Sequence, residues 1–135
     1  MHNRLLGIDY GDVRIGIAVS DPLGLTAQPV GTITNSATAI QEIIEIIVQK
    51  KVTKCIVGLP KNQHGDDSIK AASVRDFAEK LKNAFNIEIE FVDERYSTIA
   101  VTRTLNDMNI KGKKRKSVID TQAAMFILQG VLDRQ

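Results

Sequence analysis

The sequence has little of what several classes of protein require. Cys55 is its only cysteine, so no internal disulfide can form, and its two histidines are isolated and give no zinc-ligand spacing. No stretch approaches the roughly 18 consecutive apolar residues that a membrane span needs. The first residues, MHNRLLGIDYG, lack the apolar run and small-residue cleavage site of a signal peptide. We therefore expect a cytoplasmic protein with no membrane partner.

Two kinds of catalytic motif are also missing from the sequence. It has no GxxxxGK[ST] loop to hold nucleotide phosphates, and no Ser-His-Asp or Cys-His arrangement that would support nucleophilic catalysis. Aromatic residues make up only 4% of the chain, too few to suggest a platform on which single-stranded bases stack.

What is present is an ordinary globular composition with an uneven charge. The 135 residues are 43% hydrophobic and 25% charged, and this length fits one domain covering residues 1–135. Residues 1–100 hold 11 basic and 13 acidic side chains, whereas residues 101–135 hold 7 and 3. Most of that basic excess is the segment KGKKRK, residues 111–116. We predict a basic loop that meets a polyanion, the alternative being a solvated loop that binds nothing.

The spacing of apolar residues predicts an α/β fold with the element order βββαβαβαα. Strands are expected over residues 5–9, 14–21, 26–34, 54–60 and 87–95, and the short connections between the first three indicate an antiparallel meander. Apolar residues three and four apart predict helices near residues 40–47, 74–85, 97–108 and 117–132. This order implies a five-stranded mixed sheet with helices on both faces, in which right-handed crossovers make the fourth and fifth strands parallel to their neighbours. If the first strand is parallel to those two, three strand ends fall on one edge.

Acidic residues stand at two of those strand ends. Asp9 follows a run of apolar residues, where its lost hydration is costly unless a cation or hydrogen bonds compensate. The alternative is a structural aspartate that accepts backbone N–H bonds in the following turn. Asp93 and Glu94 end the fifth strand, and because side chains alternate, only one of them can point with Asp9. The alternation does not say which.

Asp120 has two interpretations that do not exclude each other. It follows Ser117 by three residues, as in a helix capping box. It also heads a stripe that must face the sheet, formed by Ala123, Ala124, Ile127 and Val131. Three acids converging on one edge would repel one another, and Mg²⁺ is a cation that prefers a few carboxylates with water and phosphate. Two such ions can activate a water and stabilise the leaving oxygen in phosphodiester hydrolysis.

Four motifs in order resemble the YqgF-type family of pre-16S rRNA nucleases and Holliday junction resolvases. They are GIDYGDVRIGIAVSD, GLPKNQHGDDS, VDERYST and KGKKRKSVIDTQAAMFILQGVLD, and they extend over nearly the whole chain. The resemblance implies a ribonuclease H-like fold. It also implies that Asp9, Glu94 and Asp120 are the catalytic, metal-binding residues, with Mg²⁺ or Mn²⁺ as the cofactor. It thereby favours Glu94 over Asp93.

The basic residues imply contacts with nucleic acid. Arg14 and Arg95 match basic positions of the family pattern and would meet phosphate. Val13 stands where a lysine or arginine is often found, which would weaken substrate binding slightly. The basic segment would supply the further contacts Lys111, Lys113, Lys114, Arg115 and Lys116.

The resemblance favours the function of a metal-dependent endonuclease on structured RNA, in processing of the pre-16S rRNA 5′ end. One alternative is a Holliday junction resolvase acting on branched DNA, which would need two active sites and hence a symmetric dimer. Another is an RNA-binding assembly factor that does not cut. GIDYG also looks like the phosphate-binding opening of actin-like ATPases and sugar kinases, but 135 residues leave no room for their second domain. No dimer surface is identifiable, so monomer and homodimer both stay open.

Overall fold

The computed structural model describes residues 3–60, 69–93 and 112–135, and in the last range it describes side chains from residue 119 onward. The strands are β1 (Arg4–Tyr10), β2 (Arg14–Ser20), β3 (Ala27–Thr34), β4 (Val52–Leu59) and β5 (Glu88–Asp93). The helices are α1 (Ala39–Lys50), α2 (Ala71–Ala84) and α4 (Gly112–Asp133). The helix predicted near residues 97–108 lies outside the described residues. Within the described ranges, no helix is long and apolar enough to cross a membrane.

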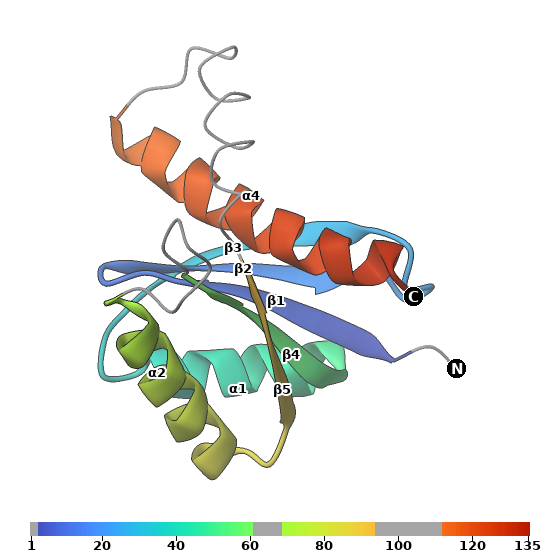
Figure 1. The fold of residues 1–135 in the computed structure, drawn as a ribbon, viewed down its shortest axis with the longest axis horizontal. Coiled ribbons are helices and arrows are strands. Elements are labelled where there is room, and N and C mark those ends of the chain that lie inside the picture. Colours follow the sequence, from blue (N-terminus) through green and yellow to red (C-terminus); the bar gives the residue numbers. More distant parts are fainter. Residues whose placement is uncertain (1–2, 61–68, 94–111) are drawn as a thin grey trace.

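The five strands form one mixed sheet in the order β3-β2-β1-β4-β5 (Figure 1). The first three strands pair antiparallel as a meander, whereas β1 pairs with β4, and β4 with β5, in parallel. Parallel strands end at the same edge of a sheet, so the carboxyl ends of β1, β4 and β5 lie together. The prediction of a five-stranded mixed sheet is confirmed.

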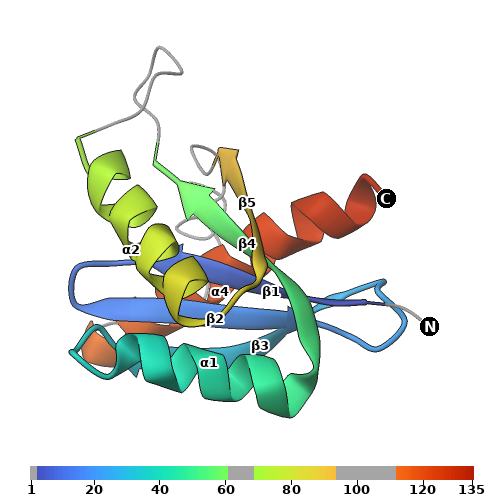
Figure 2. The same cartoon turned by 90° about the horizontal axis from the view of Figure 1, so that it is seen from below.

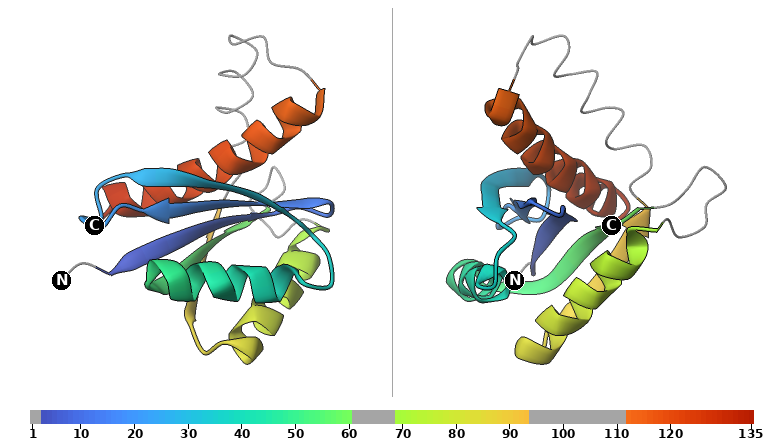
Figure 3. Two further views of the ribbon diagram at one scale, coloured as in Figure 1. Left: turned by 180° about the vertical axis from the view of Figure 1, so that it is seen from behind. Right: turned by 90° about the vertical axis from the view of Figure 1, so that its left-hand side faces the viewer.

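Helices cover both faces of this sheet, also as predicted. Helices α1 and α2 lie on one face, and α4 crosses the other (Figures 1, 2 and 3). Alternation along each strand divides the core in two, because successive side chains point to opposite faces. The α1/α2 side includes Leu6, Ile8, Ile17, Cys55 and Val57. The α4 side includes Leu5, Ala18, Ile56, Ala124 and Leu128.

Helix α4 begins earlier than the sequence patterns predicted. It starts at Gly112, not at Ser117, so residues 112–116 of the basic segment are helical and the prediction of a loop there is wrong. Lysine and arginine are good helix formers, and a single glycine at the first position costs little. Ser117, which resembled a helix cap, lies five residues after the start of the helix. A capping pattern in the sequence does not by itself prevent a helix from starting earlier.

Candidate active site

Asp9 lies near the carboxyl end of β1 and on the face that α4 covers. Leu5 packs in the core beneath α4, and a Cβ built on Gly7 would come within 2.7 Å of the Ala124 carbonyl oxygen. Because residues two apart share a face, the side chain of Asp9 follows these two on the α4 side. It is partly buried there, directly opposite Gly16 of β2 in the antiparallel pairing.

Gly16 is one of the points at which α4 lies directly against the sheet. A Cβ built at this position would overlap the carbonyl oxygen of Asp120, so only hydrogen fits between strand and helix. Directly opposed residues of an antiparallel pair have side chains on the same face. Asp9 and Asp120, from opposite ends of the chain, are therefore brought to the same part of the α4 face.

Arg14 completes this group from the first position of β2. Its Nε donates to Oδ2 of Asp120 at 3.0 Å, and the two side chains are 29% and 21% exposed. Burial raises the pKa of Asp120, while the hydrogen bond and charge of Arg14 oppose that rise. The guanidinium thus compensates only in part for the hydration that the carboxylate has lost.

Asp93 is placed on the other face of the sheet. Ile89 and Phe91 pack toward the α1/α2 core, whereas Val92 packs toward the α4 core. Alternation along β5 therefore assigns Asp93, which pairs with Leu59, to the face opposite Asp9. Asp93 is thus placed away from the face that Asp9 and Asp120 share, which the sequence pattern alone did not say.

The structure places the remaining predicted residues only in part. Glu94, Arg95 and Lys111 lie outside the described residues. The backbone of residues 113–116, which comprises Lys113, Lys114, Arg115 and Lys116, forms the first turns of α4. Asp120 is eight residues into that helix, so the interpretation of Asp120 as part of a capping box is wrong.

The two carboxylates that are brought together suit a hard cation. Over the described part of the chain, no group of three His, Cys, Asp or Glu side chains could hold a metal ion. Asp9 and Asp120 would offer carboxylate oxygens on one face, and the third predicted ligand belongs to the chain beyond Asp93. Mg²⁺ commonly binds through one or two carboxylates with water and substrate phosphate. The donor set fits such an ion.

Sequence reasoning missed two contacts that position these residues. It assigned Arg14 to phosphate and did not foresee its ion pair with Asp120. It also missed Gln129, whose Oε1 accepts from the Ala27 N–H at 2.8 Å and whose Nε2 donates to the Leu25 carbonyl at 3.0 Å. This side chain ties the far end of α4 to the β2–β3 turn, and no motif in the sequence indicates it.

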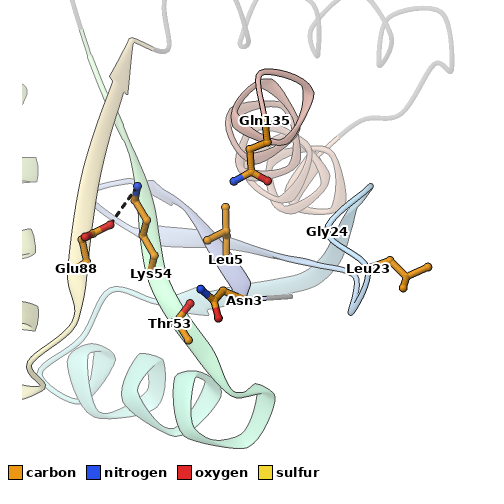
Figure 4. A pocket seen from close by; sticks show the side chains of 8 residues that line it. All are labelled: Asn3, Leu5, Leu23, Gly24, Thr53, Lys54, Glu88 and Gln135. Atoms are coloured by element: carbon orange, nitrogen blue, oxygen red, sulfur yellow. Dashed lines mark ion pairs between the residues drawn. The ribbon is translucent and has the colours of Figure 1, made fainter. Parts of the chain in front are cut away.

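A separate cavity of about 450 Å³ lies at the opposite edge of the sheet (Figure 4). Lys54 and Glu88, near the starts of β4 and β5, form an ion pair of 3.1 Å in its wall. Hydrogen bonds from Lys54 to Glu90 and Glu88 raise the pKa of that lysine. The cavity is thus lined from the amino ends of the parallel strands and is distinct from the group around Asp9.

Comparison with known proteins agrees with this architecture. A family model described as "RuvX: Holliday junction resolvase" matches residues 3–134. A protein of Clostridioides difficile (strain 630) is 45% identical over 98% of this chain and 96% of its own length. One from Ruminiclostridium cellulolyticum is 40% identical over 97% and 94%. Both bear the name "Putative pre-16S rRNA nuclease".

Solved structures of resolvases share the fold. RuvC of T. thermophilus, in complex with a Holliday junction substrate, superposes with a TM-score of 0.61 at 12% identity, covering 98% of this chain and 95% of that one. Fowlpox virus resolvase, in complex with Holliday junction DNA, gives 0.60 at 8% identity and 97% coverage of both chains. At identities this low, the similarity concerns the fold alone. It confirms the prediction of a ribonuclease H-like fold. From its family match and its close relatives, the chain belongs to the RuvX family of Holliday junction resolvases, the YqgF-type family that its motifs resemble.

Proposed function

We propose that this chain is a metal-dependent endonuclease that cuts structured RNA in the cytoplasm, in maturation of the pre-16S rRNA 5′ end. The observation that carries the proposal is the placement of Asp9 and Asp120 together over Gly16, where β1 ends. Carboxylates at such a position can hold the ions that phosphodiester hydrolysis requires. The substrate follows from the name that relatives at 40–45% identity bear.

Asp9, Glu94 and Asp120 would hold Mg²⁺ or Mn²⁺. Bound ions would supply a water activated for attack on phosphorus and would stabilise the charge on the leaving oxygen. The family resemblance favours Glu94 as the third ligand, and the placement of Asp93 on the opposite face agrees with that choice.

The protein itself would contribute rigidity and positive charge. Asp9 is fixed by the central strand of the sheet, and Asp120 by a helix in contact with that sheet at Gly16. A helix rises 1.5 Å per residue, so the backbone of residues 113–116 precedes Asp120 by about 6–10 Å along the axis. An RNA backbone bound at the carboxylates would pass these four basic positions, with Arg14, Arg95 and Lys111 as further contacts.

Cleavage of a pre-16S RNA fragment containing the 5′ leader, with Mg²⁺ present, tests the proposal. Asp9→Asn and Asp120→Asn should each lower the rate by roughly 100-fold or more, because the ligands of the ions are lost. Asp133→Asn is the matched control, since it removes the same charge from the other end of α4 and should cut like the parent. Equal rates in Asp9→Asn and the parent would refute the assignment.

Junction resolution is the second candidate, favoured by the description of the matching family model. Two symmetric cuts in a four-way junction require two active sites, and therefore a dimer. The same assay with a four-way DNA junction, together with a mass measurement by light scattering, separates the two substrates. Cutting of the junction by a dimer, with the RNA left intact, would favour resolution. Binding of either substrate without any cut would favour the assembly factor.

A further inference from the structure

The ion pair of Arg14 and Asp120 joins strand β2 to helix α4. The bond runs from Nε to Oδ2 at 3.0 Å and employs one of the five N–H donors of the guanidinium. The side chains keep 29% and 21% of their surface exposed. Solvent and solutes therefore reach both partners, and the pair commits only part of the bonding capacity of each.

The same carboxylate is one that a divalent cation would need. Asp9 shares the α4 face with it, opposite Gly16 and beneath the Asp120 backbone. A cation held by both carboxylates would stand beside the Arg14 guanidinium, and like charges a few ångströms apart repel strongly at a partly buried site. Arg14 and a metal ion therefore compete for Asp120.

We infer that Arg14 is an exchangeable counter-ion, which neutralises Asp120 in the absence of metal and moves to a nucleic-acid phosphate when metal binds. This inference rests on the proposed function. Arg14 is the first residue of β2, opposite Thr34, so its side chain leaves from the end of the strand and can turn without disturbing the sheet. A planar guanidinium also suits a phosphate, which it can bind through two parallel hydrogen bonds.

The exchange couples the two ligands. Metal binding releases the arginine that the substrate needs, and by linkage a phosphate that holds this arginine raises the affinity for metal. The effect of Arg14→Gln on metal affinity distinguishes this exchange from a purely orienting role of Arg14. If Arg14 only positions the carboxylate, its loss should weaken metal binding, whereas removal of a competitor should strengthen it.

The test measures Mn²⁺ binding to the full chain by titration calorimetry, without nucleic acid. Arg14→Gln should bind Mn²⁺ about threefold to fivefold more tightly than the parent, the upper part of the range expected for loss of a partly exposed ion pair. Lys70→Gln is the control for loss of a positive charge at the same edge. The Lys70 side chain is 78% exposed, and its Nζ lies 4.0 Å from Oδ2 of Asp12 in the turn after β1. Its substitution should leave the Mn²⁺ affinity within twofold of the parent's. Unchanged or weaker binding by folded Arg14→Gln would overturn the inference.

A second measurement uses the parent alone and so does not depend on the folding of a variant. The ¹⁵N signal of the Arg14 Nε–H group should shift when Mg²⁺ is added to saturation, because its acceptor is lost. A signal that stays in place at saturation overturns the exchange. A parent whose Mn²⁺ binding is absent, or is unaffected by Asp9→Asn, overturns the proposed metal site and the inference with it. Binding that depends on Asp9 but is indifferent to Arg14 overturns the inference alone.

Discussion

Gly16 of β2 lies against the backbone of Asp120, with no room for a side chain between them. We predict that Gly16→Ala forces α4 away from the sheet and separates Asp120 from Asp9. Overpacking of this kind typically costs about 1–3 kcal/mol of the free energy of unfolding. Urea denaturation should show this loss, and Mn²⁺ titration should show that metal binding is lost with it.

Two other glycines provide controls for this substitution. A Cβ at Gly7 would meet the Ala124 carbonyl oxygen at 2.7 Å, so Gly7→Ala should cost similar stability. It should weaken metal binding less, because Ala124 lies one helical turn away from Asp120. Gly130 has open space around it, and Gly130→Ala should stabilise α4 by about 0.5–1 kcal/mol. Equal loss of metal binding in the Gly7 and Gly16 variants would show that the effect is not local to the carboxylates.

Divalent ions should raise the melting temperature of the parent, because a ligand that binds only the folded state stabilises it by mass action. At 100 times the dissociation constant the gain is about 2.7 kcal/mol. Asp9→Asn should lose most of this gain, and Asp133→Asn should retain it. A melting temperature that does not respond to millimolar Mg²⁺ or Mn²⁺, with or without RNA, would count heavily against the mechanism.

The sheet was predictable from the sequence because its strands and helices have different periods. The apolar runs of β1 and β2, the two-residue alternation of β5 and the three- and four-residue spacings of α1 and α2 each show in a short window. The start of α4 was not predictable in this way. Gly112 and the serine five residues later resemble a loop and a cap, but the helix begins at the glycine and continues through the serine.

For the candidate site, the sequence could indicate only which acids to consider. Asp9 could be recognised because a carboxylate after a buried strand needs compensation. The pairing of Arg14 with Asp120 joins residues from the two ends of the chain, and it depends on where α4 crosses β2, which no local pattern encodes. The face of Asp93 likewise became clear only when the packing of Val92 and Phe91 fixed the orientation of β5.

The stability of the metal-free protein should depend on Asp120 in a definite direction as pH changes. Burial raises the pKa of this carboxyl in the folded state, so the folded protein binds its proton more tightly than the unfolded chain does. The charged Asp120 carboxylate therefore lowers the free energy of unfolding. This loss of stability is fully present at neutral pH and is relieved as pH falls through the folded-state pKa. Relative to Asp120→Asn, the parent should therefore gain stability between pH 7 and pH 4.

Urea denaturation at several pH values, with metal removed, measures this difference in the free energy of unfolding. The slope with pH is the informative quantity, since the loss of the Arg14 partner shifts the variant by a nearly constant amount. A difference that stays constant from pH 7 to pH 4 would mean that the pKa of Asp120 is not raised.

Cys55 should be inert in the folded protein. Its side chain is fully buried in the α1/α2 core, and burial raises the pKa of the thiol to about 12. The reactive thiolate is therefore negligible at pH 8. Ellman's reagent should label the unfolded chain but not the native one. Cys55→Ala should cost about 1 kcal/mol of stability and leave RNA cleavage unchanged. Loss of cleavage in a folded variant would place the chemistry elsewhere.

The basic turns of α4 should govern affinity for RNA more than the rate of its cleavage. Replacing Lys113, Lys114 and Arg115 with alanine removes three positive charges and keeps a strong helix former at each position. Binding to the RNA should weaken, and the slope of log affinity against log salt should fall by about 0.7–0.9 for each phosphate that the variant no longer neutralises. The control replaces Lys50, Lys80 and Lys82, on α1 and α2, and should alter both quantities much less.

The cleavage rate at saturating RNA distinguishes binding from catalysis in this variant. If the acids and their metals make the cut while these turns of α4 only hold the backbone, that rate should fall much less than the affinity does. Asp9→Asn should behave in the reverse way, binding RNA at least as well as the parent because a negative charge near the phosphate is gone, yet failing to cut. A triple-alanine variant that binds normally but cuts slowly would instead place these basic residues beside the reacting phosphate, within the active site itself.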